Sequence, residues 1–213
     1  MAKYLKLFFV ILCSCHSYIS YSQNDLDWKM RSSVSMRYNL NEKTRLISKF
    51  EYRLKDNLTE KDRWNVNTTV RYDILKNIKI DTSYELHYLK DYYGKNSFIH
   101  RFNISSQAHI DYQNFEFSLR ERLQNTFSDS GYDFYLRSRF MIEYKKYPVR
   151  PNFSIEVFQK MNSSNLVDID IVRYRPKLTF RISEKVSCCI FYCREYQKHI
   201  TNNIIGADCI IDL

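Results

Sequence analysis

Apolar and polar side chains alternate along almost the whole chain after residue 22. Across Arg63–Ile74 the even positions are Trp, Val, Thr, Val, Tyr and Ile, and the odd positions are Arg, Asn, Asn, Thr, Arg and Asp. Successive side chains of a β-strand point to opposite faces, so this period of two gives each strand one apolar and one charged face. The same part of the chain has no apolar stripe of helical period. The pattern predicts an all-β protein.

The pattern predicts eleven strands, most of them longer than the roughly 5–6 residues usual in globular proteins. Connections alternate between tight turns, such as Lys76-Asn77 and Gln113, and longer polar segments, such as Asp56–Lys61 and Asp91–Asn96. This spacing favours an up-and-down antiparallel barrel. The predicted ranges are 27–40, 43–56, 62–75, 78–90, 97–112, 114–127, 132–146, 152–161, 167–182, 185–199 and 202–213.

The number of strands is predicted within 10–12, and an even number is expected. Single-chain bacterial outer-membrane barrels have even numbers, so eleven segments imply a missed or merged strand, or a first segment outside the sheet. In 167–182 the apolar positions change from odd, as at Ile169, to even, as at Tyr174. Such a change predicts a β-bulge near Val172–Arg173.

Aromatic residues stand at both ends of the apolar faces, as at Trp64 and Tyr72 and at Phe98 and Tyr112. Eight steps from Trp64 to Tyr72 cover about 26 Å at roughly 3.3 Å per residue. A tilted strand of this length suits an apolar band about 25 Å tall between two aromatic girdles. The alternative is a soluble periplasmic, lipocalin-like binding barrel with its apolar face inward, for which the strands are long. The pattern favours the transmembrane β-barrel.

The N-terminus reads as a secretory signal peptide over residues 1–22. Lys3 and Lys6 precede the apolar run Leu7–Cys13, and Ser20-Tyr21-Ser22 gives a small-x-small site with cleavage after Ser22. An alternative is a lipobox-like site with lipidation at Cys15. The barrel domain then covers 23–213, and we expect it in the bacterial outer membrane, with outer-membrane lipid and the barrel-assembly machinery as partners.

The chain is basic, with 33 Lys and Arg against 24 Asp and Glu, and its pI is about 9.2. Removing the two signal-peptide lysines leaves 31 − 24 = +7. Nucleic-acid binding would gather these residues in one patch. They are instead spread over all the strands, and export removes the chain from the cytoplasm, so no nucleic-acid partner is predicted.

If the apolar face meets lipid, the charged face lines the interior. Its acidic members include Glu51, Asp81, Glu85, Asp111, Glu116, Glu143 and Glu156. Basic members outnumber them, and long Arg and Glu side chains in a small bore predict a plugged interior; a narrow, anion-preferring conduit is the alternative. The basic candidates are Arg53, Arg71, Arg101, Arg120, Arg122, Arg137, Arg139, Arg173 and Arg175, with Arg31, Arg37, Arg45, Lys49 and Arg181.

One weak catalytic set can be assembled from the polar face. With a tight turn near Gln113, His109 lies opposite Ser118 or Glu116, and Asp111 is two residues along, so Ser118, His109 and Asp111 could act as nucleophile, base and acid. This set would fit a lipid-modifying acyl hydrolase or transferase. His100 is expected on the lipid side, opposite positions near Tyr88 and Thr126, and His87 is expected to face Arg101. The many polar residues of a lumen produce such sets by chance, so a non-enzymatic barrel is favoured.

The cysteines form no metal site in this pattern. Cys188 and Cys189 point to opposite faces, and Cys189 and Cys193 lie about 13 Å apart along the strand. Cys188 and Cys209 would meet if the last hairpin turns between residues 198 and 199, as a disulfide or as free thiols. No cofactor is predicted.

Short motifs with arginine at strand centres recur along the chain. They include Trp28 at the first strand, Phe50–Arg53, His100–Phe102, Leu119–Gln124, Leu136–Arg139 and Arg173–Arg175. On these residues the chain resembles a family of short, uncharacterised bacterial outer-membrane β-barrel proteins, known only as a domain of unknown function. The resemblance implies the fold and the location and carries no established activity.

Overall fold

The structure, a computed structural model, describes residues 27–90, 95–129, 131–146, 148–162, 168–198 and 200–213. The expected signal peptide, the lipidation alternative at Cys15, and His199 therefore lie outside the described residues. Within these ranges no helix is long and apolar enough to cross a membrane.

Eleven strands make up the fold, and each begins and ends within three residues of its predicted range. The all-β prediction is therefore confirmed. The strands are β1 (Asp27–Asn39), β2 (Thr44–Lys55), β3 (Glu60–Leu75), β4 (Ile78–Lys90), β5 (Asn96–Tyr112), β6 (Phe115–Ser128), β7 (Gly131–Tyr144), β8 (Val149–Lys160), β9 (Ile169–Arg181), β10 (Val186–Gln197) and β11 (Ile200–Asp212).

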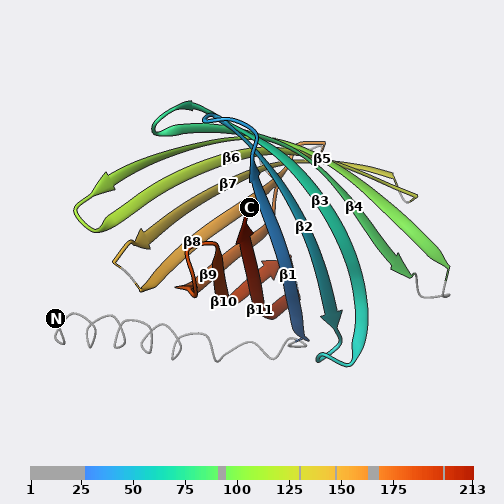
Figure 1. The fold of residues 1–213 in the computed structure, drawn as a ribbon. Coiled ribbons are helices and arrows are strands. Elements are labelled where there is room, and N and C mark those ends of the chain that lie inside the picture. Colours follow the sequence, from blue (N-terminus) through green and yellow to red (C-terminus); the bar gives the residue numbers. More distant parts are fainter. Residues whose placement is uncertain (1–26, 91–94, 130, 147, 163–167, 199) are drawn as a thin grey trace.

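The strands close into one barrel (Figure 1). Each strand pairs antiparallel with its neighbours in sequence, whereas β1 and β11 pair parallel, from Asp27 opposite Asn202 to Arg37 opposite Asp212. The expectation of an even number is therefore wrong, and the first segment belongs to the sheet. In a meander with an odd number of strands the first and last run in the same direction, so a barrel can close only through a parallel pair.

The parallel seam is also held by side chains and by the end of β11. Ser33 donates a hydrogen bond to Asp208 at 2.5 Å across the two strands. Arg37 lies 3.8 Å from Asp212, and the backbone nitrogen of Leu213 donates to the carbonyl of Arg37 at 2.9 Å. The seam is therefore a full-length strand pair with polar links of its own.

A β-bulge is found on β9, slightly earlier than predicted. Gln159 pairs with Ile169 and Phe158 with Ile171, so Asp170 is the extra residue of β9. Asp170 lies two residues before Val172, whereas the parity change in the sequence predicted a bulge near Val172–Arg173. The bulge leaves Asp170 buried and Ile169 exposed, and it sets the following Arg173 on the inner face.

The connections follow the predicted alternation only in part. Lys76-Asn77 is a two-residue turn as predicted, and the turn predicted at Gln113 also includes Asn114. Gln113 has the positive φ of 53° that such a turn requires. The connections 129–130 and 198–199, expected to be longer, also have two residues.

The two faces of the barrel wall have opposite chemistry. Large apolar side chains such as Ile104, Phe102 and Leu119 are about half exposed on the outside. Most of the buried side chains are polar or charged, among them Glu51, Asn103 and Glu156. The buried apolar side chains of the described residues are Phe158, Cys189, Phe191, Cys193 and Ile204. A water-soluble protein has the opposite arrangement.

Gly206 lies at the centre of β11, opposite Arg31 of β1 and Phe191 of β10. A Cβ added there would fall on the ring of Phe191 and lie 2.5 Å from the carbonyl oxygen of Arg31. Glycine at this position therefore lets the buried Phe191 ring lie against the backbone of the seam.

We expect Gly206→Ala to lower the free energy of unfolding by about 1–3 kcal/mol, because the methyl group forces apart a packed ring and the closing strand pair. Urea unfolding in detergent, followed by tryptophan fluorescence, measures the loss. Ala207→Val is the control, because Ala207 is the next residue and points to the exposed face. A Gly206→Ala variant as stable as wild type would contradict this packing.

Candidate functional site

The interior of the barrel is organised around four glutamates from four different strands. They are Glu51 of β2, Glu85 of β4, Glu156 of β8 and Glu195 of β10, and their side chains are at most 13% exposed. A buried carboxylate is costly unless it is paired and hydrogen-bonded. Each of the four has at least two basic neighbours, so the candidate site is this ion network inside the barrel.

Glu156 has the most basic contacts. Arg120 of β6 donates to its Oε1 at 2.6 Å, and Arg137 of β7 donates to its Oε2 at 3.1 Å. Arg173 of β9 lies 3.8 Å from the same carboxylate. One carboxylate thus ties together three neighbouring strands besides its own.

Phe158 lies on the inner face of β8, two residues after Glu156. The guanidinium of Arg137 stands 4.2 Å from its ring centroid and that of Arg173 stands 4.3 Å from it. Cation–π contacts gain strength when the groups are removed from water, and this ring is 4% exposed. Phe158 therefore orients two of the three arginines that reach Glu156.

Glu195 of β10 connects the network around Glu156 with the parallel pair β1–β11. Arg173 donates to Glu195 at 2.5 Å, and Arg31 of β1 lies 3.7 Å away. Asn202 of β11 donates to the other carboxylate oxygen at 3.0 Å. The parallel pair β1–β11 is therefore linked through Glu195 and Arg173 to Glu156.

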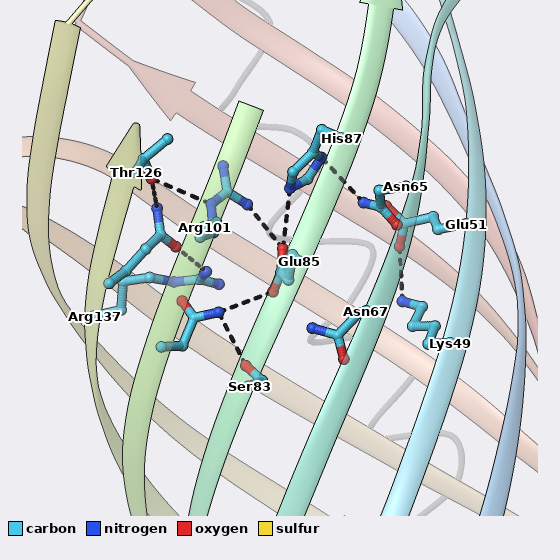
Figure 2. Close-up of polar contacts among 12 residues, drawn as sticks. Lys49, Glu51, Asn65, Asn67, Ser83, Glu85, His87, Arg101, Thr126 and Arg137 are labelled. Atoms are coloured by element: carbon cyan, nitrogen blue, oxygen red, sulfur yellow. Dashed lines mark hydrogen bonds and ion pairs between the residues drawn. The ribbon is translucent and has the colours of Figure 1, made fainter. Parts of the chain in front are cut away.

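Strands β2 to β5 carry a second cluster, around Glu51 and Glu85 (Figure 2). Glu51 accepts hydrogen bonds from Lys49 at 2.7 Å and from Arg53 at 2.5 Å. Glu85 accepts from Arg101 at 3.2 Å and from Asn103 at 3.1 Å.

His87 connects these two glutamates through Asn65. Asn65 Nδ2 lies 3.3 Å from His87 Nδ1 and 3.5 Å from Glu51 Oε1, and His87 Nε2 lies 3.1 Å from Glu85. A neutral imidazole that accepts at Nδ1 and donates at Nε2 satisfies both of its contacts. His87 is fully buried, so it acts as a bridge within the network.

Positive charge exceeds negative charge on the β6–β7 wall. Arg122 and Arg139 make no ion pair and no side-chain hydrogen bond among the described residues. Arg175 contacts the Phe191 ring at 5.1 Å and has no carboxylate within 4.0 Å in the described chain.

Of the fourteen basic candidates, the structure places on the inner face, buried or half-buried, Arg53, Arg71, Arg101, Arg120, Arg122, Arg137, Arg139, Arg173 and Arg175, whereas Arg181 is exposed. Arg71 makes a bidentate contact to Asp81 at 2.7 and 2.9 Å. Sequence reasoning missed Glu195 and Phe158. Glu195 shares the parity of the inward Cys189 and Cys193, so alternation could have found it. Phe158 shares the parity of Glu156, but an aromatic residue was expected to face outward.

The weak catalytic set is only partly assembled. His109 and Ser118 are directly opposite, as the Gln113 turn implied. Asp111, however, is exposed and accepts a hydrogen bond from Lys145 at 2.7 Å. None of these three described residues hydrogen-bonds to another, so the structure provides a facing pair and no triad.

Lys145, just beyond the end of β7, lies 2.8 Å from Glu116 as well as bonding Asp111. Partial burial acts to lower the pKa of Lys145, but these two hydrogen bonds and the two negative charges raise it above its ordinary value. Lys145 therefore stays charged at neutral pH and bridges Asp111 and Glu116.

The two other described histidines lie within two positions of their predicted partners. His100 is opposite Leu86 and Phe127, near the predicted Tyr88 and Thr126, and its Nδ1 contacts the hydroxyl of Tyr84 at 2.8 Å. His87 is opposite Ile99 rather than Arg101, and Glu85 is the residue opposite Arg101.

The cysteine register was predicted correctly. Cys188 and Cys209 are directly opposite across the β10–β11 hairpin, and both are free thiols. Cys189 and Cys193 lie buried on the inner face. In the described ranges no group of three or more His, Cys, Asp or Glu could hold a metal ion.

A family model described as "Protein of unknown function (DUF2490)" matches residues 28–205, which cover β1 to β10 and the first half of β11. No curated protein matches the chain.

We expect Phe158→Leu to lower the free energy of unfolding by about 1–3 kcal/mol, since two buried cation–π contacts are lost. Phe153→Leu, on the outward face of the same strand, is the control and should cost less than about 1.5 kcal/mol. Urea titration measures both. A double-mutant cycle between Phe158→Leu and Arg137→Gln should give a coupling of at least about 0.5 kcal/mol. Equal costs for the two Phe variants and no coupling would show that Phe158 does not orient Arg137.

Proposed function

Because the chain belongs to this family, whose description assigns no activity, we propose its function from the barrel itself. The protein is an integral β-barrel of the bacterial outer membrane whose lumen is closed by ion-paired side chains. Its role is structural, and any path through it is narrow and prefers anions. The observation that carries the proposal is the reversed burial of the wall, apolar outside and charged inside.

The outward face suits lipid. Ile104 at the centre of β5 is 59% exposed and Leu119 on β6 is 51% exposed, and the same face continues around the barrel. Exposed apolar surface of this extent is unfavourable in water and marks a surface that contacts protein or lipid. Because the barrel has closed its last edge, every backbone group of the ladder can be satisfied without water.

Aromatic side chains gather towards both rims. At one rim the rings of Trp64 and Tyr88 are 5.2 Å apart, and Tyr88 and Phe98 are 5.5 Å apart. At the other rim Phe115 and Tyr144 are 5.1 Å apart. Two aromatic girdles flanking an aliphatic band are typical of transmembrane barrels.

The inner face argues against a soluble binding barrel. A lipocalin-like protein would line its lumen with apolar side chains around a ligand. Here Glu51, Glu85, Glu156 and Glu195 and their basic partners occupy that space. Long ion-paired side chains directed into the bore support a closed lumen over an open pore.

Cell fractionation tests the location. The protein expressed from its own full-length sequence in a Gram-negative host should be recovered with outer membranes and require detergent for extraction. It should also migrate differently in unboiled and boiled gel samples. Recovery in the periplasmic fraction without detergent would contradict the proposal and favour a soluble barrel.

A charge on the lipid-facing side gives a sharper prediction. Ile104→Arg should destabilise the protein in bilayers by about 2–4 kcal/mol, because arginine then lies at the membrane midplane. Ile110→Arg, on the same face of the same strand and two residues from its end, should cost about 0–1 kcal/mol. Unfolding in lipid vesicles by guanidinium measures both. In a soluble barrel the two variants would be equal, since both isoleucines are exposed.

A further inference from the structure

Four inward arginines form a block on two neighbouring strands. Arg120 of β6 lies directly opposite Arg139 of β7, and Arg122 lies directly opposite Arg137. Like charges directly opposite in a sheet destabilise it. Two such arginine pairs next to each other therefore destabilise the β6–β7 strand pair unless something else compensates their charge. We call Arg120, Arg122, Arg137 and Arg139 the arginine block.

The protein supplies too little negative charge for this block. Glu156 is the one carboxylate of the described chain that contacts it, at Arg120 and Arg137. The formal charge is thus 4 − 1 = +3, and Glu156 also serves Arg173. Among the described residues, Arg122 and Arg139 have no carboxylate within 4.0 Å.

The carboxylates nearest to the arginine block in the sheet make their close contacts with other basic residues. Asp81 of β4 and Arg122 of β6 lie at the same level of the sheet, on either side of Ser105 of β5. Asp81 accepts a bidentate contact from Arg71. Glu85 is taken by Arg101 and His87.

Hydrogen-bond donors of the block are also unused. The Nε atoms of all four arginines are buried and have no hydrogen-bond partner among the described residues. Arg122 and Arg139 donate from no other side-chain nitrogen either. Arg120 and Arg137 are 9% and 8% exposed. Buried donors of this kind are normally satisfied, and buried charges are normally paired.

We propose that the arginine block is a binding site for one small oxyanion of the phosphate class. The planar fork of a guanidinium matches pairs of oxygen atoms on phosphate, sulfate or carboxylate, and several forks on one wall can hold one such ion. The bound oxyanion supplies negative charge next to the block and accepts hydrogen bonds from the terminal guanidinium nitrogens of Arg122 and Arg139, which donate to no other described group. Phe158 and Glu156 hold Arg137 in place for it.

The site deepens the proposed function, because it gives the narrow, basic lumen a specific ligand. It rests on that function only for its location inside a membrane barrel. Binding can be measured on the folded full-length protein in a maltoside detergent. Such a detergent carries no phosphate, so the free ion is the only source of the ligand.

The first experiment compares thermal unfolding in inorganic phosphate and in chloride at equal ionic strength and pH. We expect phosphate to raise the midpoint by about 5–10 °C when its concentration is about a hundredfold above the dissociation constant. Isothermal titration calorimetry with phosphate should give one site. Equal midpoints and no binding heat would overturn the proposal.

Variants then assign the site. Arg122→Gln and Arg139→Gln should each abolish the phosphate shift. In phosphate-free buffer they should melt at or above the wild-type temperature, because like-charge repulsion is relieved. The order of stability thus reverses with phosphate, which a purely structural arginine would not produce. Arg122→Lys keeps the charge but loses the fork, and should keep only part of the shift.

Arg45→Gln is the matched control, because Arg45 on β2 is half-buried and bonds Asn39 without any carboxylate. It should retain the full phosphate shift. A shift that persists in both Arg122→Gln and Arg139→Gln would overturn the assignment to the arginine block. A protein found in the outer membrane that ignores phosphate would sink this inference alone, whereas a periplasmic protein that binds phosphate would sink only the proposed location.

Discussion

The ion pairs around Glu156 are the contacts on which the interior depends most. This carboxylate is 4% exposed, and arginines from β6, β7 and β9 reach it. Removing one partner from a buried ion pair leaves an uncompensated charge and is strongly destabilising. Through Arg173 the same network passes to Glu195 and then to Arg31 of β1. Ion pairs between side chains therefore connect strands β6, β7, β8 and β9 with β1, the strand that closes the barrel.

Closure is the second constraint, and it depends on the first strand as much as on the last. Eleven strands in a meander leave β1 and β11 running in the same direction, so the barrel has a parallel seam. Parallel pairing is slightly weaker per residue than antiparallel pairing. The seam compensates with Ser33 and Asp208, with the Arg31–Glu195 contact, and with Gly206, which admits Phe191.

Alternation along the sequence was enough to predict the strands and the inward face of most of the arginines it singled out, because side-chain direction between bulges depends on parity. The number of strands could not be predicted in the same way. Parity within one strand says nothing about how the first and last strands meet. The expectation of an even number came from other barrels and failed on the β1–β11 pair.

The sequence predicted which kinds of charged residue line the interior, but not which residues pair with each other. Arg120 and Arg137 share Glu156, whereas Arg122 has no carboxylate within 4.0 Å in the part of the chain that the structure describes. This difference depends on the register of three strand pairs and on the β9 bulge. The inward position of Phe158 was missed because an aromatic residue in a strand of this kind is expected to face lipid. The Cys188–Cys209 pairing was predicted only on the condition that the hairpin turns between residues 198 and 199, and the two-residue turn there fixes that register.

The central claim is that the apolar face of this wall meets lipid while the charged face is enclosed. Trp28 and Trp64, the two tryptophans of the chain, lie on the outward face near the same rim. Fluorescence quenching by lipids brominated at different depths measures their surroundings directly. The account predicts strong quenching by bromines near the headgroups, weaker quenching by bromines near the chain ends, and little quenching by aqueous iodide. Full quenching by iodide with none from any brominated lipid would contradict it.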